Sequence, residues 1–317
     1  MKRPALSIVI PTRNRPEAAA SCVSRMLKCE PGDFELILVD QSEGPETEKA
    51  LAFAASDPRV RYLRSSLRGA AAARNVGIEQ AQGELIAFTD DDCIVAPDWV
   101  RGIHQVFDSD QTIEAMFGRV AVPPPPPGTW AAGFAASPNE AQWCGYPRFP
   151  EGWGMSANMV CRRRVFDTTG TFDQLMGPGS PLKASEDFDL FIRMRKAGIK
   201  IVNAEQVTVD HVGFRGGRDL RNLVCGYFFS VGAAFIKHVR LGEVALLAIL
   251  ARRGARLLAS GCKQLLLGNG VGGLRNFACL MRGTFASFRY NIDQKGQLYI
   301  APVVVPRESE QAKTAQK

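Results

Sequence analysis

The amino-acid sequence predicts an α/β fold with a doubly wound, mostly parallel sheet that carries helices on both faces. Short apolar segments alternate with amphipathic segments over about the first ninety residues, and most of the apolar segments are apolar throughout rather than at every second position. Strands of this kind are typical of parallel sheets covered by helices. The chain has 317 residues, of which 46% are hydrophobic, so it is long enough to form a sizeable core.

The predicted strands and helices follow one another in a regular order. The first strand, at residues 6–10, is rich in β-branched residues and is closed by Pro11. A helix follows, because Pro16 suits a first turn and Val23 and Met26 lie at helical spacing. The same reasoning predicts strands at 34–39, 60–63, 85–88, 116–122 and 199–202, and helices at 45–55, 69–81, 97–107 and 185–197. Five prolines at 123–127 open a loop-rich stretch that reaches about residue 154, since polyproline cannot join a sheet.

Charge is distributed unevenly along the chain, whose formal net charge is +7. Residues 215–300 contain 13 basic and three acidic residues, whereas residues 223–236 contain no charge. Apolar runs this short do not span a bilayer, which needs about 20 residues, but they suit interfacial or buried helices. Basic residues beside such an amphipathic helical region attract anionic lipids, so we expect it to lie on a membrane surface. A helical cap on the main domain is the alternative, and nucleic acid is not an expected partner, because no aromatic and basic residues interleave here.

The cysteines indicate a reducing compartment. All eight lie far apart, with no Cys-x-x-Cys pair and no cluster at zinc-ligand spacing, so we interpret them as buried thiols. The apolar run near the N-terminus is cut short by Pro11 and Arg13, which does not suit a signal peptide. We therefore expect a cytoplasmic protein, peripheral on the cytoplasmic face of the inner or plasma membrane.

Carboxylates follow two of the predicted strands. Asp40 ends the second strand, and the consecutive Asp90, Asp91 and Asp92 follow the segment at 85–88. Ligands of doubly wound sheets bind at these carboxyl ends. Neighbouring carboxylates raise one another's pKa unless a cation neutralises them, and Mg²⁺ and Mn²⁺ prefer oxygen ligands from carboxylates, phosphates and water. The cluster therefore predicts a divalent-metal site, with a solvated loop or a helix N-cap as the alternative.

Five segments together resemble the family-two glycosyltransferases of the GT-A fold. In chain order they are Ser7-Ile8-Val9-Ile10-Pro11-Thr12-Arg13-Asn14, Leu38-Val39-Asp40-Gln41-Ser42, Ala73-Arg74-Asn75, Thr89-Asp90-Asp91-Asp92 and Ser185-Glu186-Asp187. No segment is specific alone, but five in register are a strong signal. The resemblance covers about residues 6–214, two thirds of the chain. It implies a nucleotide-sugar donor held over Mn²⁺ or Mg²⁺.

The resemblance implies roles for individual residues at the donor site. The DxD motif of the family maps to Asp90 and Asp92, with Asp92 as the direct metal ligand and Asp91 as a further candidate, and His211 resembles a histidine that meets the metal or the diphosphate. Gln41 stands where the family usually has a second aspartate. For Arg74, a buried structural ion pair is the alternative to a nucleotide contact. The residues implied to bind the nucleotide sugar are Pro11, Thr12, Arg13, Asp40, Arg74, Asp90, Asp91, Asn158 and Arg215.

Glu186 and Asp187 open a predicted helix whose apolar residues share one face. By similarity to the family, Asp187 is the catalytic base of a single in-line displacement, and Glu186 helps to position the acceptor. Transfer to a hydroxyl requires a group that takes the acceptor's proton. Acidic residues also stabilise the first turn of a helix, so simple helix-end electrostatics are the alternative.

Together these observations predict a metal-dependent, inverting glycosyltransferase that transfers a sugar from a nucleotide-diphosphate sugar to a glycan or lipid-linked acceptor. We expect a catalytic domain at 1–214, a basic apolar helical region at 215–300 and a flexible tail at 301–317. One rival is a nucleotidyltransferase that makes a nucleotide-sugar, although residues 11–15 lack the glycine that its phosphate loop usually carries. The other rival is a non-catalytic nucleotide-sugar-binding component of a glycan-assembly complex.

Overall fold

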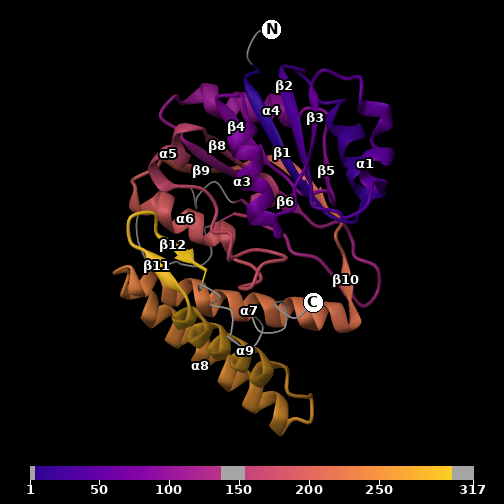
Figure 1. The fold of residues 1–317 in the computed structure, drawn as a ribbon. Helices are drawn as coiled ribbons and strands as arrows, with labels where there is room; N and C mark the ends of the chain where they lie inside the picture. The colour runs from indigo at the N-terminus through magenta and orange to yellow at the C-terminus, as the bar shows by residue number, and fades with distance from the viewer. Residues whose placement is uncertain (1–3, 137–153, 302–317) are drawn as a thin grey trace, which may run out of the picture.

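A single mixed sheet forms the centre of the α/β body (Figure 1). The computed structural model describes residues 4–136 and 154–301, so nearly all of the predicted tail lies outside the described residues. The sheet has the strand order β3-β2-β1-β4-β8-β6-β9-β5. Its strands are β1 (Leu6–Thr12), β2 (Phe34–Asp40), β3 (Val60–Arg64), β4 (Leu85–Phe88), β5 (Cys93–Val95), β6 (Ala115–Ala121), β8 (Met159–Arg162) and β9 (Ile201–His211).

The predicted fold class is confirmed, with a departure at one side of the sheet. Strands β3, β2, β1 and β4 are mutually parallel, and β6 is parallel to β9. Strand β8 instead runs antiparallel to both β4 and β6, and β5 runs antiparallel to β9. An antiparallel strand needs no crossover helix, which is why the alternation of strands and helices did not predict these short strands.

Helices cover both faces of the sheet and create two cores. Alternate residues of β1 and β2 point to opposite faces, so Ile8 and Leu38 belong to one apolar cluster and Val9 and Val39 to the other. Helices α1 and α4 contribute to the first cluster, and α3, α6 and α7 contribute to the second. The helices of the α/β body are α1 (Pro16–Met26), α2 (Glu46–Ala50), α3 (Ala70–Gln80), α4 (Trp99–Ser109), α5 (Arg164–Thr169) and α6 (Glu186–Lys196).

Several short elements differ from the sequence prediction. The helix expected at 45–55 is divided into α2 and a short 3₁₀ helix, Ala52–Ala54, and the strand expected at 199–202 is the beginning of the longer β9. Two small antiparallel sheets pair β7 (Thr129–Trp130) with the distant β10 (Arg215–Gly216), and β11 (Asn291–Asp293) with β12 (Leu298–Ile300) in a hairpin. Pairing with distant strands extends β9, and such contacts are not encoded in local periodicity.

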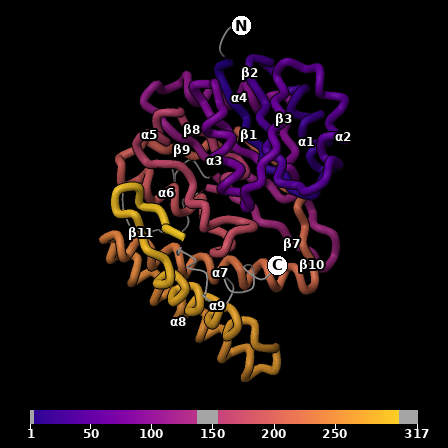
Figure 2. Tube along the Cα trace, viewed as in Figure 1, coloured from indigo at the N-terminus to yellow at the C-terminus, as the bar shows by residue number. Residues whose placement is uncertain are grey.

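Three helices follow the α/β body: α7 (Gly217–Arg240), α8 (Ala245–Leu266) and α9 (Gly272–Ala286). Helix α7 lies against the α/β body, whereas α8 and α9 extend away from it (Figures 1 and 2). The fully buried Phe235 of α7 stacks on Phe188 of α6, at 5.2 Å between ring centroids. Within the described residues, α7 alone is long and apolar enough to cross a membrane, and half of its apolar stretch is buried in the fold.

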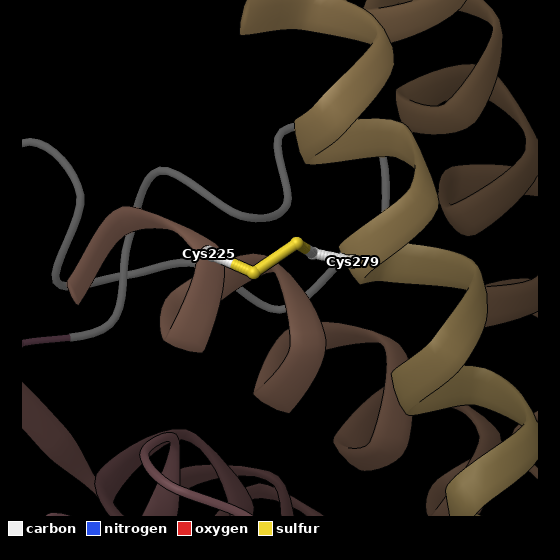
Figure 3. Close-up of a disulfide and its surroundings, with 2 residues drawn as sticks. All are labelled: Cys225 and Cys279. Carbon is white, nitrogen blue, oxygen red and sulfur yellow. A yellow bond between two sulfur atoms is a disulfide. The ribbon is translucent and has the colours of Figure 1, made fainter. Parts of the chain in front are cut away.

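The interpretation of all eight cysteines as buried thiols was wrong. Cys225 of α7 and Cys279 of α9 form a disulfide (Figure 3), and Cys262 is exposed. Cys144 lies outside the described residues. The remaining four, Cys22, Cys29, Cys93 and Cys161, are buried thiols as predicted. Sequence spacing does not show that α7 and α9 pack side by side, and this packing brings the two sulfur atoms together.

Candidate active site

A cavity of about 570 Å³ lies at the carboxyl ends of β1 and β4, and residues of α6 and α7 complete its wall. Ligands bind at this edge of open α/β sheets. The structure brings most of the predicted site residues to this one cavity. Those that line it are Pro11, Thr12, Arg13, Arg74, Asp90, Asp91, Asp92, Glu186, Asp187, His211 and Arg215.

Two of the three consecutive aspartates share an arginine partner. A single guanidinium nitrogen of Arg15 lies 2.7 Å from Asp91 Oδ1 and 2.8 Å from Asp92 Oδ2. Thr12 at the end of β1 also donates a hydrogen bond to Asp91, at 2.7 Å. Burial raises the pKa of Asp91. Asp91 is therefore held by protein partners, and the half-buried Asp92 is the more available carboxylate.

His211 lies on the other side of Asp92. Its Nε2 atom is 3.4 Å from Asp92 Oδ1, and its Nδ1 atom donates a hydrogen bond to the carbonyl oxygen of Ala132, at 2.8 Å. Burial opposes ionisation of Asp92, but the hydrogen bond from His211 and the charge of Arg15 outweigh it and lower the pKa of Asp92 to about 2. Asp92 is therefore a carboxylate at neutral pH.

The donors around Asp92 and His211 fit a divalent cation that shares its coordination with a substrate. The carbonyl of Ala132 holds Nδ1 of His211, so Nε2 is the nitrogen that could bind a metal once it gives up the proton that it shares with Asp92. A Cβ at Gly213 would come within 2.4 Å of Asp92 Oδ2 and 2.8 Å of His211 Nε2, so only glycine leaves this space open. No group of three His, Cys, Asp or Glu within 4–136 and 154–301 could hold a metal alone. Diphosphate oxygens and water would have to complete the shell, as Mg²⁺ sites commonly require.

Arg74 connects the aspartate cluster to helix α6. Its side chain is 2% exposed and donates hydrogen bonds to Asp90, at 2.7 Å, and to Glu186, at 2.8 Å. Both partners also line the cavity. Burying a guanidinium requires such compensation, so the structure supports the ion-pair interpretation of Arg74 and shows how two separate motifs are held together.

Asp187 has the properties expected of a base. It is half-buried in the first turn of α6, after Ser185, whose φ of 68° lies in the left-handed region that non-glycine residues seldom adopt. Burial and the neighbouring charge of Glu186 raise the pKa of Asp187 to about 7. The backbone N–H of Phe188 donates a hydrogen bond to its carboxylate, at 2.8 Å. This carboxyl group therefore changes its charge near neutral pH.

The structure does not bring Asp40 and Asn158 to the cavity. Asp40 is fully buried and accepts hydrogen bonds from Ser42 and from the hydroxyl of Tyr62, at 2.7 Å. Asn158 is also fully buried, where it accepts a hydrogen bond from the indole of Trp99 and donates to two backbone carbonyls. Their side chains are saturated inside the protein, so their implied contacts with the donor find no support in this arrangement.

Sequence reasoning missed several residues that line the cavity, among them Arg15, Tyr227 and Arg253. Arg15 closely follows the first strand, and the three aspartates follow another strand of the same sheet. The opposite charges of Arg15 and these aspartates could have predicted an ion pair between them. Tyr227 and Arg253 come from the C-terminal helices and line the same cavity, but no motif marks them. Only the docking of α7 on the α/β body, together with the packing of α8 against α7, places these side chains near the strand ends.

Two solved structures share this fold at low sequence identity. The mannosyltransferase PcManGT from Pyrobaculum calidifontis, in complex with GDP-Man and Mn²⁺, is 16% identical with a TM-score of 0.59, and the match covers 91% of this chain and 88% of that one. TarS of S. aureus is 14% identical with a TM-score of 0.50, over 71% of this chain and 39% of that one. The fold is therefore of the GT-A type that the sequence predicts.

Sequence comparison places the chain within that fold class. The model described as glycosyl transferase family 2 matches residues 7–169, just over half of the chain. The chain belongs to glycosyl transferase family 2, and its class is that of the glycosyltransferases.

Curated relatives match over part of their length. The putative colanic acid biosynthesis glycosyl transferase WcaA of Escherichia coli K12 is 28% identical over 201 residues, which cover 60% of this chain and 66% of WcaA. Glycosyltransferase GlyG of Streptococcus pneumoniae is 36% identical over 32% of this chain and 34% of its own length. For an uncharacterized glycosyltransferase of Rickettsia conorii, 33% identical, the match covers 27% of this chain and 14% of the relative.

Proposed function

We propose that this protein is an inverting, metal-dependent glycosyltransferase that moves a sugar from a nucleotide-diphosphate sugar to an acceptor hydroxyl. One observation supports this proposal above the others: the strand-end carboxylates, His211 and the half-buried Asp187 all line one cavity. The mannosyltransferase neighbour, which was solved with GDP-Man and Mn²⁺, supports a nucleotide-sugar donor and a divalent ion.

The chain's own residues divide the chemistry between two groups of cavity-lining side chains. Asp187 accepts the proton of the acceptor hydroxyl as the hydroxyl oxygen attacks the anomeric carbon. The bond between that carbon and the diphosphate breaks on the opposite face, and the nucleoside diphosphate leaves with the bonding electron pair. A single displacement of this kind inverts the configuration at the anomeric carbon.

The leaving diphosphate needs compensation for its developing charge. Asp92 and His211 would hold Mn²⁺ or Mg²⁺, which supplies Lewis-acid stabilisation to that charge when bound. Arg215, whose guanidinium lies 4.0 Å from Asp92, is a cation of this chain that suits the phosphates. Arg74 positions Asp90 and Glu186 through its two buried ion pairs.

The distribution of charge supports a domain organisation with a catalytic part at residues 1–214. The basic region at 215–300 adds side chains to the cavity wall and attaches the protein to the cytoplasmic face of a membrane. Exposed apolar side chains on the C-terminal helices support this attachment, among them Val244, Leu247, Leu265, Leu266 and Phe285. The basic residues around them suit an anionic membrane surface.

The test of the metal-dependent donor site is the release of nucleoside diphosphate from a panel of nucleotide-sugars, with Mn²⁺ and with chelator. We expect release with Mn²⁺ and a loss of at least 100-fold in chelator or in Asp92→Asn, because the diphosphate then leaves without a stabilising cation. The matched control is Asp98→Asn, an exposed aspartate close in sequence that does not line the cavity. Full activity of folded Asp92→Asn would contradict the metal assignment.

The same samples separate the two rival functions. A nucleotidyltransferase would release pyrophosphate from a nucleoside triphosphate and a sugar phosphate. A non-catalytic component would bind a nucleotide-sugar with Mn²⁺ but would not transfer its sugar to any acceptor.

A further inference from the structure

One part of the cavity wall has no role in the chemistry described so far. Leu223, Tyr227 and Val231 of α7 line the cavity, and all three side chains are half-buried. They are spaced four residues apart, so they share one face of the helix. We call these three residues the α7 stripe. Apart from the hydroxyl of Tyr227, the side chains of the stripe offer no hydrogen-bonding group, which does not suit the hydroxyls of a free glycan.

The α7 stripe lies near the catalytic carboxylates. Burial, together with the charges of Asp187 and Glu186, raises the pKa of the Tyr227 hydroxyl to about 12. The ring of Tyr227 also packs edge-on against the indole of Trp130, at 6.4 Å between centroids. The stripe and the proposed base therefore line the same cavity, with Tyr227 near Asp187.

A cation without a partner among the described residues also lines this cavity. Arg253 of α8 lines it, and no described residue forms a hydrogen bond or an ion pair with its guanidinium. Burial and the neighbouring charge of Arg256 lower the pKa of Arg253. A partly buried guanidinium without a counter-charge is unfavourable unless an anion binds beside it. Asp92 and the cations around it, Arg15, His211 and Arg215, form a separate cluster.

We propose that the α7 stripe and Arg253 form the acceptor subsite, and that the acceptor is a lipid-linked sugar phosphate or diphosphate. Its apolar chain lies on the stripe, its phosphate binds Arg253, and its sugar hydroxyl faces Asp187. Beyond Arg253, helix α8 carries exposed apolar residues such as Leu258 and Leu265. The lipid chain of the acceptor would pass along these residues to a membrane. This inference rests on the proposed glycosyl transfer.

The experiment measures binding of geranyl diphosphate by calorimetry to the full chain, after its donor site has been saturated with Mn²⁺ and a nucleoside diphosphate. Geraniol, which lacks the anion, and inorganic diphosphate, which lacks the chain, are the comparison ligands. We expect each of these two to bind at least tenfold more weakly than geranyl diphosphate. The variants are Arg253→Gln, Arg253→Lys and Leu223→Ser, and the matched control is Arg252→Gln, an exposed arginine next in sequence.

Arg253→Gln should weaken geranyl diphosphate binding at least tenfold, Leu223→Ser should weaken it severalfold, and Arg253→Lys should retain part of it, while Arg252→Gln stays within twofold. All variants should still bind the nucleoside diphosphate with Mn²⁺, which shows that they are folded. Unchanged binding in Arg253→Gln, or equally tight binding of inorganic diphosphate, would overturn the inference. If the wild type binds the nucleoside diphosphate but not geranyl diphosphate, the acceptor inference fails and the proposed function stands. If it binds neither, the proposed function fails.

Discussion

Asp187 combines two requirements of a catalytic base that usually conflict. A carboxylate in water is ionised but weakly basic, whereas a fully buried one is basic but protonated. Half-burial beside Glu186 brings the pKa of Asp187 to about 7, so an ionised and fairly basic carboxylate exists near neutral pH. The raised pKa makes the Asp187 carboxylate more basic, but it also means that the carboxylate is protonated in mild acid.

This pKa predicts the pH profile of transfer. A base acts when deprotonated, so kcat/KM should rise about tenfold per pH unit below 7 and level off above about 8. Glu186→Gln removes the neighbouring negative charge and should move the rise to lower pH. Donor and Mn²⁺ binding measured at each pH serves as the control. A rate that is flat between pH 5 and 8 would exclude Asp187 as the base.

The sequence predicted well which residues after strands or at the start of helices lie at the site. It predicted their hydrogen-bond and ion-pair partners poorly. Asp90, Asp92 and His211 reach one cavity because the carboxyl ends of parallel strands meet at one edge, and Asp187 reaches it from the first turn of α6. Asp40 also ends a strand, yet a tyrosine hydroxyl from β3 and Ser42 occupy its oxygens inside the protein. Side-chain partners such as these depend on tertiary packing, which no motif encodes.

At the scale of elements, a buried charge network joins α6 to α7. Lys237 of α7 lies 2.5 Å from Asp189 of α6 and 2.7 Å from Asp173, and all three are fully buried. Arg193 and His238 also pair with Asp189. Asp189 lies two residues beyond Asp187, so this network fixes the helix that carries the proposed base. Helix α7 is therefore anchored to α6, and through it to the α/β body.

Removing Lys237 from this network should destabilise the whole chain. In Lys237→Met, buried Asp173 loses its ion-pair partner, while Asp189 keeps Arg193 and His238. Breaking a buried ion pair by removing one partner costs about 3–5 kcal/mol. We expect the free energy of unfolding, measured in urea, to fall by about that amount. Lys263→Met, at an exposed lysine of α8, should change it by less than about 0.5 kcal/mol. A loss below about 1 kcal/mol in Lys237→Met would show that the network does not join α6 to α7 in solution.

Local sequence patterns were sufficient to predict some of the strands and helices but not others. Strands β1, β2 and β4 are buried along almost their whole length, and their apolar runs predicted them directly. Helix α7 was predicted only as an uncharged run of 14 residues, because polar residues at its ends concealed its full length of 24 residues. The hairpin of β11 and β12 was missed, since strands of three residues leave no periodic signal.

For the whole molecule, charge and exposed apolar area coincide on the C-terminal helices. Leu265, Leu266 and Leu267, at the end of α8, are 58%, 88% and 60% exposed. The exposed Arg252, Arg256 and Lys263 come from the same helix. Apolar side chains that enter a bilayer and cations that meet anionic lipids add their contributions. This surface therefore suits an anionic membrane.

Flotation with lipid vesicles tests this surface. The wild type should float with anionic vesicles, less so at high salt because salt screens the charges, and hardly with neutral ones. Changing Leu265, Leu266 and Leu267 to Ser should weaken binding at least tenfold, because each leucine contributes about 1.5–3 kcal/mol when buried. Phe53→Ser, at an exposed residue of the α/β body, is the control. Equal flotation with neutral vesicles, or an unchanged triple variant, would contradict membrane attachment through α8.

Donor binding and turnover in Asp187→Asn together test whether Asp187 is the catalytic base. This variant keeps the shape of the side chain but cannot accept a proton, so it should bind the nucleotide-sugar and Mn²⁺ like the wild type. Its transfer rate to an acceptor should fall about 100- to 10,000-fold, the usual contribution of a general base. A folded Asp187→Asn that transfers sugar at the wild-type rate would show that Asp187 is not the catalytic base.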